Sequence, residues 1–273
     1  EEPTLEDFEP QPKDKGLWVH EVLQKFYSAH LDQVHNVIKG QLPASLLADQ
    51  LQDATSAVLR DHPESLKPHV IQVVAERIQH DVLKLLELEA HLYDKGKKKT
   101  LPHTFEWSLG DGQNSGLPIQ VDKTLWQIRG RVDRIDIDPD TGDFSVVDYK
   151  TGAGVERKDL LELNSLQIPL YWYGAQQFLF KTGEPSAGLY YSFKNAKFTQ
   201  LVLSDSADEK LTSKNYRITA EDWDELQSRM LEKIKSSLKS IENGEFPATP
   251  QDERLCGFCA FRRHCPKTLE VAC

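Results

Sequence analysis

The chain has 273 residues, and 39% of them are apolar, which suffices for the core of one large domain or of two small ones. Its net charge of −10 at pH 7 counts against simple non-specific nucleic-acid binding, because that function usually shows as a basic excess. No stretch approaches the roughly 18 apolar residues that span a bilayer, and no signal-peptide pattern opens the chain, so we expect no membrane partner.

The N-terminal third is predicted to be helical. Residues 1–15 are polar and Pro-rich without periodicity, which indicates a flexible lead-in. The first residue is not Met, so we expect a chain cut from something longer. Apolar residues at helical spacing predict helices from Gly16 onward, over about 45–61 and over about 68–93.

The middle of the chain is predicted to form strands. β-branched and aromatic residues alternate in three stretches, at 104–109, 125–138 and 143–150. The segment Asp138-Pro139-Asp140-Thr141-Gly142 is a strong turn signal, so the last two stretches should form an antiparallel hairpin.

The remaining elements complete an α/β (α+β) fold. A helix over about 164–180 is followed by strands near 188–193 and 198–203. Thr219-x-x-Asp222 is a capping box that opens a last helix, over about 219–243. We therefore predict a central mixed β-sheet flanked by helices, with a helical N-terminal portion.

The predicted hairpin carries the residues with the most specific chemistry. Side chains alternate along a strand, so Asp148 and Lys150 point to one face while Tyr149 points to the other. Asp133 lies on the partner strand, within Gly-Arg-Val-Asp-Arg-Ile-Asp. Two carboxylates brought together in this way can hold Mg²⁺ or Mn²⁺. The metal can activate a water, while the lysine steadies that water or the developing negative charge.

Each of these residues has a plainer interpretation when it is taken alone. Asp148 and Lys150 could form an ordinary surface salt bridge, and a lone histidine such as His20 is more often packed or solvated than bound to metal. Local basic runs at 95–99 and 254–267 indicate either binding surface or solvated surface. The other acids near the hairpin are typical of turn and edge positions: Asp136, Asp138, Asp140 and Asp143.

A glutamine and a tyrosine form a further candidate pair. Gln167 and Tyr171 are four residues apart and share a helix face. If Asn164 or Ser165 is the N-cap, Pro169 falls in the first turn, where amide protons lack intrahelical partners. The pair would then lie near a helix start, suited to contacting a phosphate or a base; an ordinary polar pair is the alternative.

Five motifs occur in an order that resembles the RecB-like branch of the PD-(D/E)xK nucleases. They are Gly-x-x-x-His (16–20), Glu106 in a strand, Gly-Arg-Val-Asp-Arg-Ile-Asp (130–136), Val-Val-Asp-Tyr-Lys-Thr-Gly (146–152) and Gln-x-x-x-Tyr (167–171). The pattern is most similar to the C-terminal nuclease domains of AddB-type subunits of bacterial helicase–nuclease repair complexes. It covers Gly16 to about Pro266, and its most specific part is Gly130 to Gly152.

The resemblance implies a restriction-endonuclease-like core within a nuclease domain over 16–250. Its parts would be a helical portion (about 16–95), a catalytic core (about 100–205) and the C-terminal helix, with a cysteine-cluster tail over 251–273. The implied reaction is Mg²⁺- or Mn²⁺-dependent hydrolysis of DNA phosphodiesters. The resemblance points to an exonuclease acting on a single-stranded end that a helicase subunit or domain supplies.

The same resemblance implies a role for each candidate residue. The metal ligands would be His20, Asp133, Asp148 and the carbonyl of Tyr149. Lys150 would be the catalytic lysine, and Gln167 and Tyr171 would position the DNA strand or the catalytic centre. Glu106 matches a recurrent acidic position without an assigned role.

Three of the four cysteines, Cys256, Cys259 and Cys265, lie within ten residues. This clustering argues against a disulfide framework and for a reducing, cytoplasmic setting. Clustered thiolates suit an iron–sulfur cluster or zinc, and unrelated thiols are the alternative.

The resembling family uses the three cysteines for a [4Fe–4S] cluster, with a fourth ligand upstream of Gly16. No cysteine precedes Cys256. Either the chain starts after that ligand or Cys273 substitutes for it. We favour truncation and expect an incomplete cluster, with poor order after about residue 245.

Two other classes of function compete with a nuclease. One is a non-catalytic DNA-binding or scaffolding module that retains the nuclease fold. The other is an interaction domain stabilised by zinc or a cluster. The chain has no Gly-x4-Gly-Lys-[Ser/Thr] motif, so any helicase activity must come from elsewhere.

Overall fold

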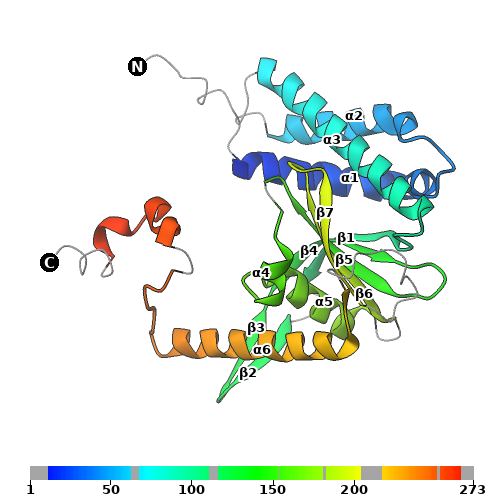
Figure 1. Cartoon of the computed structure of the whole chain (residues 1–273). Coiled ribbons are helices and arrows are strands. Elements are labelled where there is room, and N and C mark those ends of the chain that lie inside the picture. Colours follow the sequence, from blue (N-terminus) through cyan, green and yellow to red (C-terminus); the bar gives the residue numbers. More distant parts are fainter. Residues whose placement is uncertain are drawn as a thin grey trace, which may run out of the picture.

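The computed structural model describes residues 12–62, 68–110, 116–152, 154–180, 183–203, 217–250 and 253–265. In these ranges six strands form one central sheet between two groups of helices, and two further strands form a separate hairpin (Figure 1). The mixed sheet, its flanking helices and the helical start confirm the predicted fold class. No helix in the described ranges is both long and apolar enough to cross a membrane.

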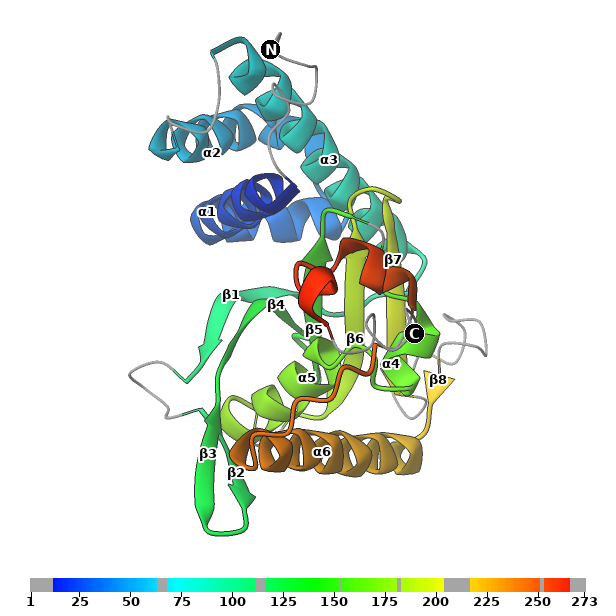
Figure 2. The ribbon, with the colours of Figure 1, turned by 90° about the vertical axis from the view of Figure 1, so that its left-hand side faces the viewer.

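Three helices precede the sheet and cover one of its faces (Figures 1 and 2). They are α1 (Pro12–Ile38), α2 (Ala48–Asp61), which follows the short 3-10 helix η2 (Ala44–Leu47), and α3 (Pro68–Asp94). Their apolar stripes pack on Val147 and Tyr191 of the sheet in one continuous core. Residues 12–15, predicted to belong to the lead-in, are helical, and residues 1–11 lie outside the described part.

The central sheet has the strand order β1–β4–β5–β6–β7–β8. Its strands are β1 (Leu101–Leu109), β4 (Gly130–Ile137), β5 (Phe144–Lys150), β6 (Pro185–Ser192), β7 (Lys197–Leu203) and β8 (Arg217–Ile218). β5 pairs with β6, and β7 with β8, in parallel; the other neighbouring pairs are antiparallel. A parallel pair needs a crossover, which α4 (Arg157–Leu161) and α5 (Gln167–Phe178) provide between β5 and β6.

A second core lies on the other face of the sheet, under α5 and α6 (Ala220–Glu242). Trp172 of α5 and Trp223 of α6 are both buried, with ring centroids 4.2 Å apart. α6 begins with the predicted capping box: the Thr219 side chain accepts from the Asp222 N–H, and the Asp222 side chain accepts from the Thr219 N–H. The start of this helix is therefore set by its own sequence.

The prediction of one strand over 125–138 is wrong. β3 (Thr124–Ile128) pairs with β2 (Leu117–Val121), a strand that was not predicted, and this hairpin lies along α6 (Figure 2). β4 pairs instead with β1 and β5. Trp126 of β3 donates its indole N–H to Glu242 of α6 at 2.9 Å. The stretch divides because its two halves have different pairing partners.

A buried ionic network joins the helical layer to the sheet. Arg134 is fully buried and donates to Glu89 of α3, to Asp136 at 2.9 Å and to the Tyr149 hydroxyl at 2.7 Å. Lys98 adds a second cation, 2.9 Å from Asp136. Two cations thus balance two carboxylates, which burial of charge requires. The prediction that Asp136 is a turn or edge residue is therefore wrong.

The turn between β4 and β5 contains the remaining acids. Asp138 Oδ1 accepts the Asp140 N–H at 2.8 Å, and Asp143 donates its N–H to Thr141 Oγ1 at 3.2 Å. These contacts confirm the predicted turn. In the basic run at 95–99, Lys98 is buried, while Lys95, Lys97 and Lys99 are exposed.

Two short 3-10 helices, η5 (Glu253–Phe258) and η6 (Arg262–His264), contain or flank the cysteine cluster. An extended segment joins them to α6, and Figure 1 shows them to the side of the sheet. None of their residues is buried. Cys273 lies outside the described residues.

Candidate metal centre at the open end of a hairpin

The candidate site lies where β4 and β5 separate. Their backbone pairing runs from Ile137 opposite Phe144 to Arg134 opposite Val147. One residue further, Asp133 Oδ2 accepts the N–H of Tyr149 at 2.7 Å. A side chain thus replaces the backbone acceptor that a continued ladder would supply. The two strands open at this point and leave space for the groups that follow.

His20 of α1 and two carboxylates meet at this opening. The ligand atoms of His20, Glu106 and Asp133 all lie within 4.8 Å of one another, and no other group of this kind occurs among the described residues. His20 Nδ1 is 3.3 Å from Asp133 Oδ1 and 3.7 Å from Glu106 Oε1. Its Nε2 lies 3.2 Å from the Tyr149 carbonyl oxygen. Three distant parts of the chain therefore converge on one candidate cation site.

The charge state of His20 reflects these neighbours. Burial alone would lower its pKa, but the hydrogen bond to Asp133 and the negative charge of Glu106 outweigh burial and raise the pKa to about 10. A protonated imidazole thus balances the two carboxylates. A metal ion at the same place would take over this role, because metal ligation requires neutral imidazole.

Glu106 has an unusual backbone. Its φ of +49° lies in the left-handed region, which costs residues with a side chain about 1–3 kcal/mol. The side chain also accepts from Arg131 Nε at 3.0 Å. The sequence marked Glu106 only as an acid in a strand and did not place it among the ligands. The structure sets its carboxylate beside His20 and Asp133.

Asp148 and Lys150 point to the same side of β5, as predicted. Lys150 Nζ donates to Gln167 Oε1 at 2.7 Å and forms an ion pair with Asp148 Oδ2, also at 2.7 Å. This is no surface salt bridge, because Asp148 is almost fully buried. Burial, together with the charge of Asp133, raises the pKa of Asp148 to about 6. The raised pKa therefore reflects mainly the loss of solvent around this carboxyl, with the negative charge of Asp133 adding to it.

Gln167 and Tyr171, the pair predicted from the sequence, both lie in the first half of α5. Gln167 is the first residue of α5, so Pro169 falls in the first turn as expected, but the N-cap is Leu166 and not Asn164 or Ser165. Tyr171 is largely buried, and its ring would lie 2.9 Å from a Cβ placed on Gly130. Only glycine at this position allows α5 to approach β4 so closely.

His20, Glu106, Asp133 and Tyr171 border a hollow of about 480 Å³, which we call the site hollow. It is lined by Lys13, Gly16, Leu17, His20, Glu21, Glu106, Arg131, Asp133 and Tyr171. The donor set fits a hard divalent cation, since it combines carboxylate and carbonyl oxygens with one imidazole nitrogen. The described surface therefore offers a cation site that opens into a space for substrate.

The cysteines do not form a comparable group. Cys256, Cys259 and Cys265 carry no disulfide, and the N–H of Cys259 donates to the Cys256 carbonyl at 3.4 Å. Their sulfur atoms are not among the ligand atoms that lie within 4.8 Å of one another. Cluster binding by these residues therefore remains a prediction.

The sequence was compared with known proteins. The family model described as "PD-(D/E)XK nuclease superfamily" matches residues 2–266, which is nearly the whole chain. A solved structure described as "Crystal structure of SSO0001" is similar, with 15% identity and a TM-score of 0.32 over 91% of this chain and 84% of that one. At this identity and score the likeness adds nothing to the fold described above. No curated protein matches the sequence significantly.

Proposed function

We propose that this chain, which belongs to the PD-(D/E)XK nuclease superfamily, is a deoxyribonuclease that hydrolyses DNA phosphodiesters with a divalent metal at the open end of the β4–β5 hairpin. One observation carries the proposal: Asp133 belongs to the one group of three candidate metal-ligand side chains found in the described residues, and Asp148, the ion-pair partner of Lys150, interacts electrostatically with Asp133 and His20 of that group. The family supports nuclease chemistry, and the geometry supplies residues for each part of it.

The metal would be held by His20, Asp133 and Asp148, with the Tyr149 carbonyl and Glu106 completing the donor set. Mg²⁺ or Mn²⁺ bound there would neutralise charge on the phosphate and lower the pKa of a bound water. Asp133 has a second task in the chain itself, because its other oxygen holds the Tyr149 backbone in place. The same residue thus shapes the site and would bind the ion.

Two contacts hold the ammonium group of Lys150 in place and leave it able to bind a further acceptor. This group has three donors. Gln167 Oε1 accepts one of them at 2.7 Å, and the Asp148 carboxylate forms an ion pair with the group at 2.7 Å. A remaining donor can bind a phosphate oxygen or the attacking water, where it would stabilise developing negative charge. Lys13 and Arg131 border the site hollow and supply positive charge for the DNA backbone.

The test is a cleavage assay on single- and double-stranded DNA with Mg²⁺, Mn²⁺ or EDTA. Asp148→Asn and Lys150→Met should each lower cleavage by at least about 100-fold, which is the usual loss when one transition-state contact is removed. Asp140→Asn is the matched control, because Asp140 is exposed in the turn of the same hairpin. Metal-independent cleavage, or full cleavage by both site variants, would contradict the proposal. A folded chain that never cuts would favour a scaffolding role.

A narrower role follows from the order of the motifs. We propose an exonuclease acting on a single-stranded end, in the manner of RecB-like and AddB-type nucleases, with a helicase partner in a cytoplasmic repair complex. DNA labelled at the 5′ or the 3′ end would show stepwise products from one end. Internal cuts in circular single-stranded DNA would count against an exonuclease.

The cysteine tail is proposed to complete an iron–sulfur cluster with a ligand from a longer chain. The support is the Cys-x2-Cys-x5-Cys spacing and the three thiols free of disulfides. A longer chain purified without oxygen should contain iron and absorb visible light, and Cys259→Ser should remove both signals. Absence of iron from such a chain would end the cluster proposal.

A further inference from the structure

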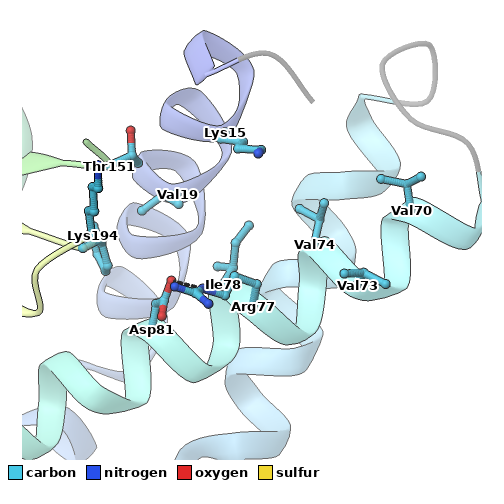
Figure 3. A pocket seen from close by; sticks show the side chains of 11 residues that line it. Lys15, Val19, Val70, Val73, Val74, Arg77, Ile78, Asp81, Thr151 and Lys194 are labelled. Atoms are coloured by element: carbon cyan, nitrogen blue, oxygen red, sulfur yellow. Dashed lines mark hydrogen bonds and ion pairs between the residues drawn. The ribbon is translucent and has the colours of Figure 1, made fainter. Parts of the chain in front are cut away.

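A second hollow lies next to the site hollow, between α1 and α3, and we call it the α1–α3 hollow. Its volume is about 530 Å³, within the range of small-molecule and cofactor sites and far larger than a water or an ion needs. Figure 3 shows it between the two helices and the segments that follow β5 and β6, which contribute Thr151 and Lys194.

The walls of this hollow combine an apolar surface with cations. Val19 of α1 and Val74 and Ile78 of α3 lie on its facing sides (Figure 3). Phe193, which follows β6, also lines it. Apolar side chains on two sides suit the flat faces of a base.

The charged residues lining the hollow are three cations and one anion. The cations are Lys15, Arg77 and Lys194, and the anion, Asp81, is already paired with Arg77 at 2.9 Å. This local excess of positive charge stands out in a chain with a net charge of −10. This positive charge complements an anionic ligand. In a nucleotide, the base that the apolar walls would bind carries such an anion, its phosphate.

The first turns of α1 form a wall shared by the two hollows. Lys15 and Val19 line the α1–α3 hollow, while Gly16 and His20, one position further on, line the site hollow. A Cβ on Gly16 would lie 3.7 Å from Thr151 Oγ1, so α1 packs against the residue that follows the catalytic lysine. The two hollows therefore lie on either side of the first turns of α1, and a DNA strand bound at the metal centre could reach the second hollow by passing around the start of this helix.

From these observations we infer that the α1–α3 hollow binds one unpaired nucleotide of the DNA strand that is cleaved at the metal centre. The inference rests on the proposed nuclease function and names a second binding site for its single-stranded substrate. A base inserted between Val19 and Val74 cannot remain stacked and paired in a duplex, so the substrate must be single-stranded or frayed at this position. Lys194, exposed at the rim, would contact the adjacent phosphate.

Binding without cleavage tests the inference directly. Anisotropy of a labelled single-stranded oligonucleotide is measured in EDTA, with the full chain carrying Asp148→Asn. Val74→Phe, which fills the hollow, should raise Kd about five- to tenfold, the usual effect of losing one base contact. Lys194→Ala should lower the slope of log K against log salt by about 0.7, the value for one phosphate contact. Lys197→Ala, an exposed lysine of β7 outside the hollow, is the matched control and should change neither quantity.

A series of oligonucleotides, each with one abasic position at a different place, gives a result that a loss of protein stability in Val74→Phe could not produce. One position should weaken binding to the protein with native Val74, and this penalty should vanish with Val74→Phe. Unchanged Kd in Val74→Phe and Lys194→Ala, equal effects of Lys194→Ala and Lys197→Ala, or equal affinity for blunt duplex would each overturn the inference. Because cleavage is not needed, failure of the subsite and failure of the nuclease proposal are separate outcomes.

Discussion

The backbone N–H of Tyr149 donates to the Asp133 carboxylate over 2.7 Å, and this bond spans the point where β4 and β5 part. Without it, the Tyr149 amide would be a buried donor beyond the end of the ladder. The bond leaves the other oxygen of Asp133 facing His20 at 3.3 Å. One side chain therefore links the local backbone to the candidate metal centre.

This dual role predicts different results for two substitutions of Asp133. Asp133→Asn keeps an oxygen acceptor for Tyr149 but removes the charge, so it should unfold at nearly the native urea concentration while binding Mn²⁺ poorly. Asp133→Ala removes the acceptor as well and should lose about 1–3 kcal/mol of unfolding free energy. Urea unfolding and Mn²⁺ titration of both variants check this. Equal stability of the two variants would show that the bond contributes nothing.

Glu106 should trade stability for metal binding. Glycine adopts a φ of +49° without steric cost, so Glu106→Gly should leave stability unchanged or raise it by about 1 kcal/mol. The same variant should bind Mn²⁺ at least about tenfold more weakly in calorimetry, which is the usual loss of affinity when a residue around a metal site is replaced. Glu87→Gly, on the exposed side of α3, should instead lose about 1 kcal/mol. A destabilised Glu106→Gly protein with native Mn²⁺ affinity would refute the assignment.

Arg134 should be among the most sensitive positions for stability. Arg134→Met leaves Glu89 and Asp136 buried with Lys98 as the one remaining cation of the network, and breaking such networks costs about 3–5 kcal/mol. Chemical unfolding measures the loss. Arg60→Met, on the exposed side of α2, should change stability by less than about 0.5 kcal/mol. Similar values for the two variants would mean that the network is not needed for the fold.

The capping box of α6 gives a local test of sequence-encoded structure. Thr219→Ala removes the acceptor for the Asp222 N–H and should cost about 1 kcal/mol in unfolding free energy. Ser237→Ala, inside the same helix, should be neutral or slightly stabilising, because alanine has the higher helix propensity. If both substitutions behave alike, the cap does not stabilise the helix start.

Local spacing predicted a large part of this site. Strand alternation placed Asp148 and Lys150 on one side of β5, and a helix start shortly before Pro169 was recognisable because proline is tolerated in the first turn, although the N-cap was placed one or two residues too early. The capping box and the turn at Asp138 also depend on residues close in sequence. Interactions of this range follow from backbone geometry alone, so a sequence shows them directly.

Pairing between distant segments could not be predicted in this way. The stretch over 125–138 was predicted as one strand, and its partners, β2 for one half and β1 for the other, divide it. Asp136 resembles its acidic neighbours in the sequence, yet Arg134 and Lys98 make its burial possible. Each of these results depends on what another part of the chain brings close.

The sequence by itself determined the kind of chemistry, because the order and spacing of His20, Asp133, Asp148 and Lys150 are properties of the chain. Only the tertiary structure decided how these groups meet. It brought Glu106 to the candidate metal centre through a strained backbone, opened the hairpin at Asp133 and placed a cationic, apolar hollow on the other side of α1. Such features arise where packed elements face one another, and the free energy of that packing depends on all partners at once.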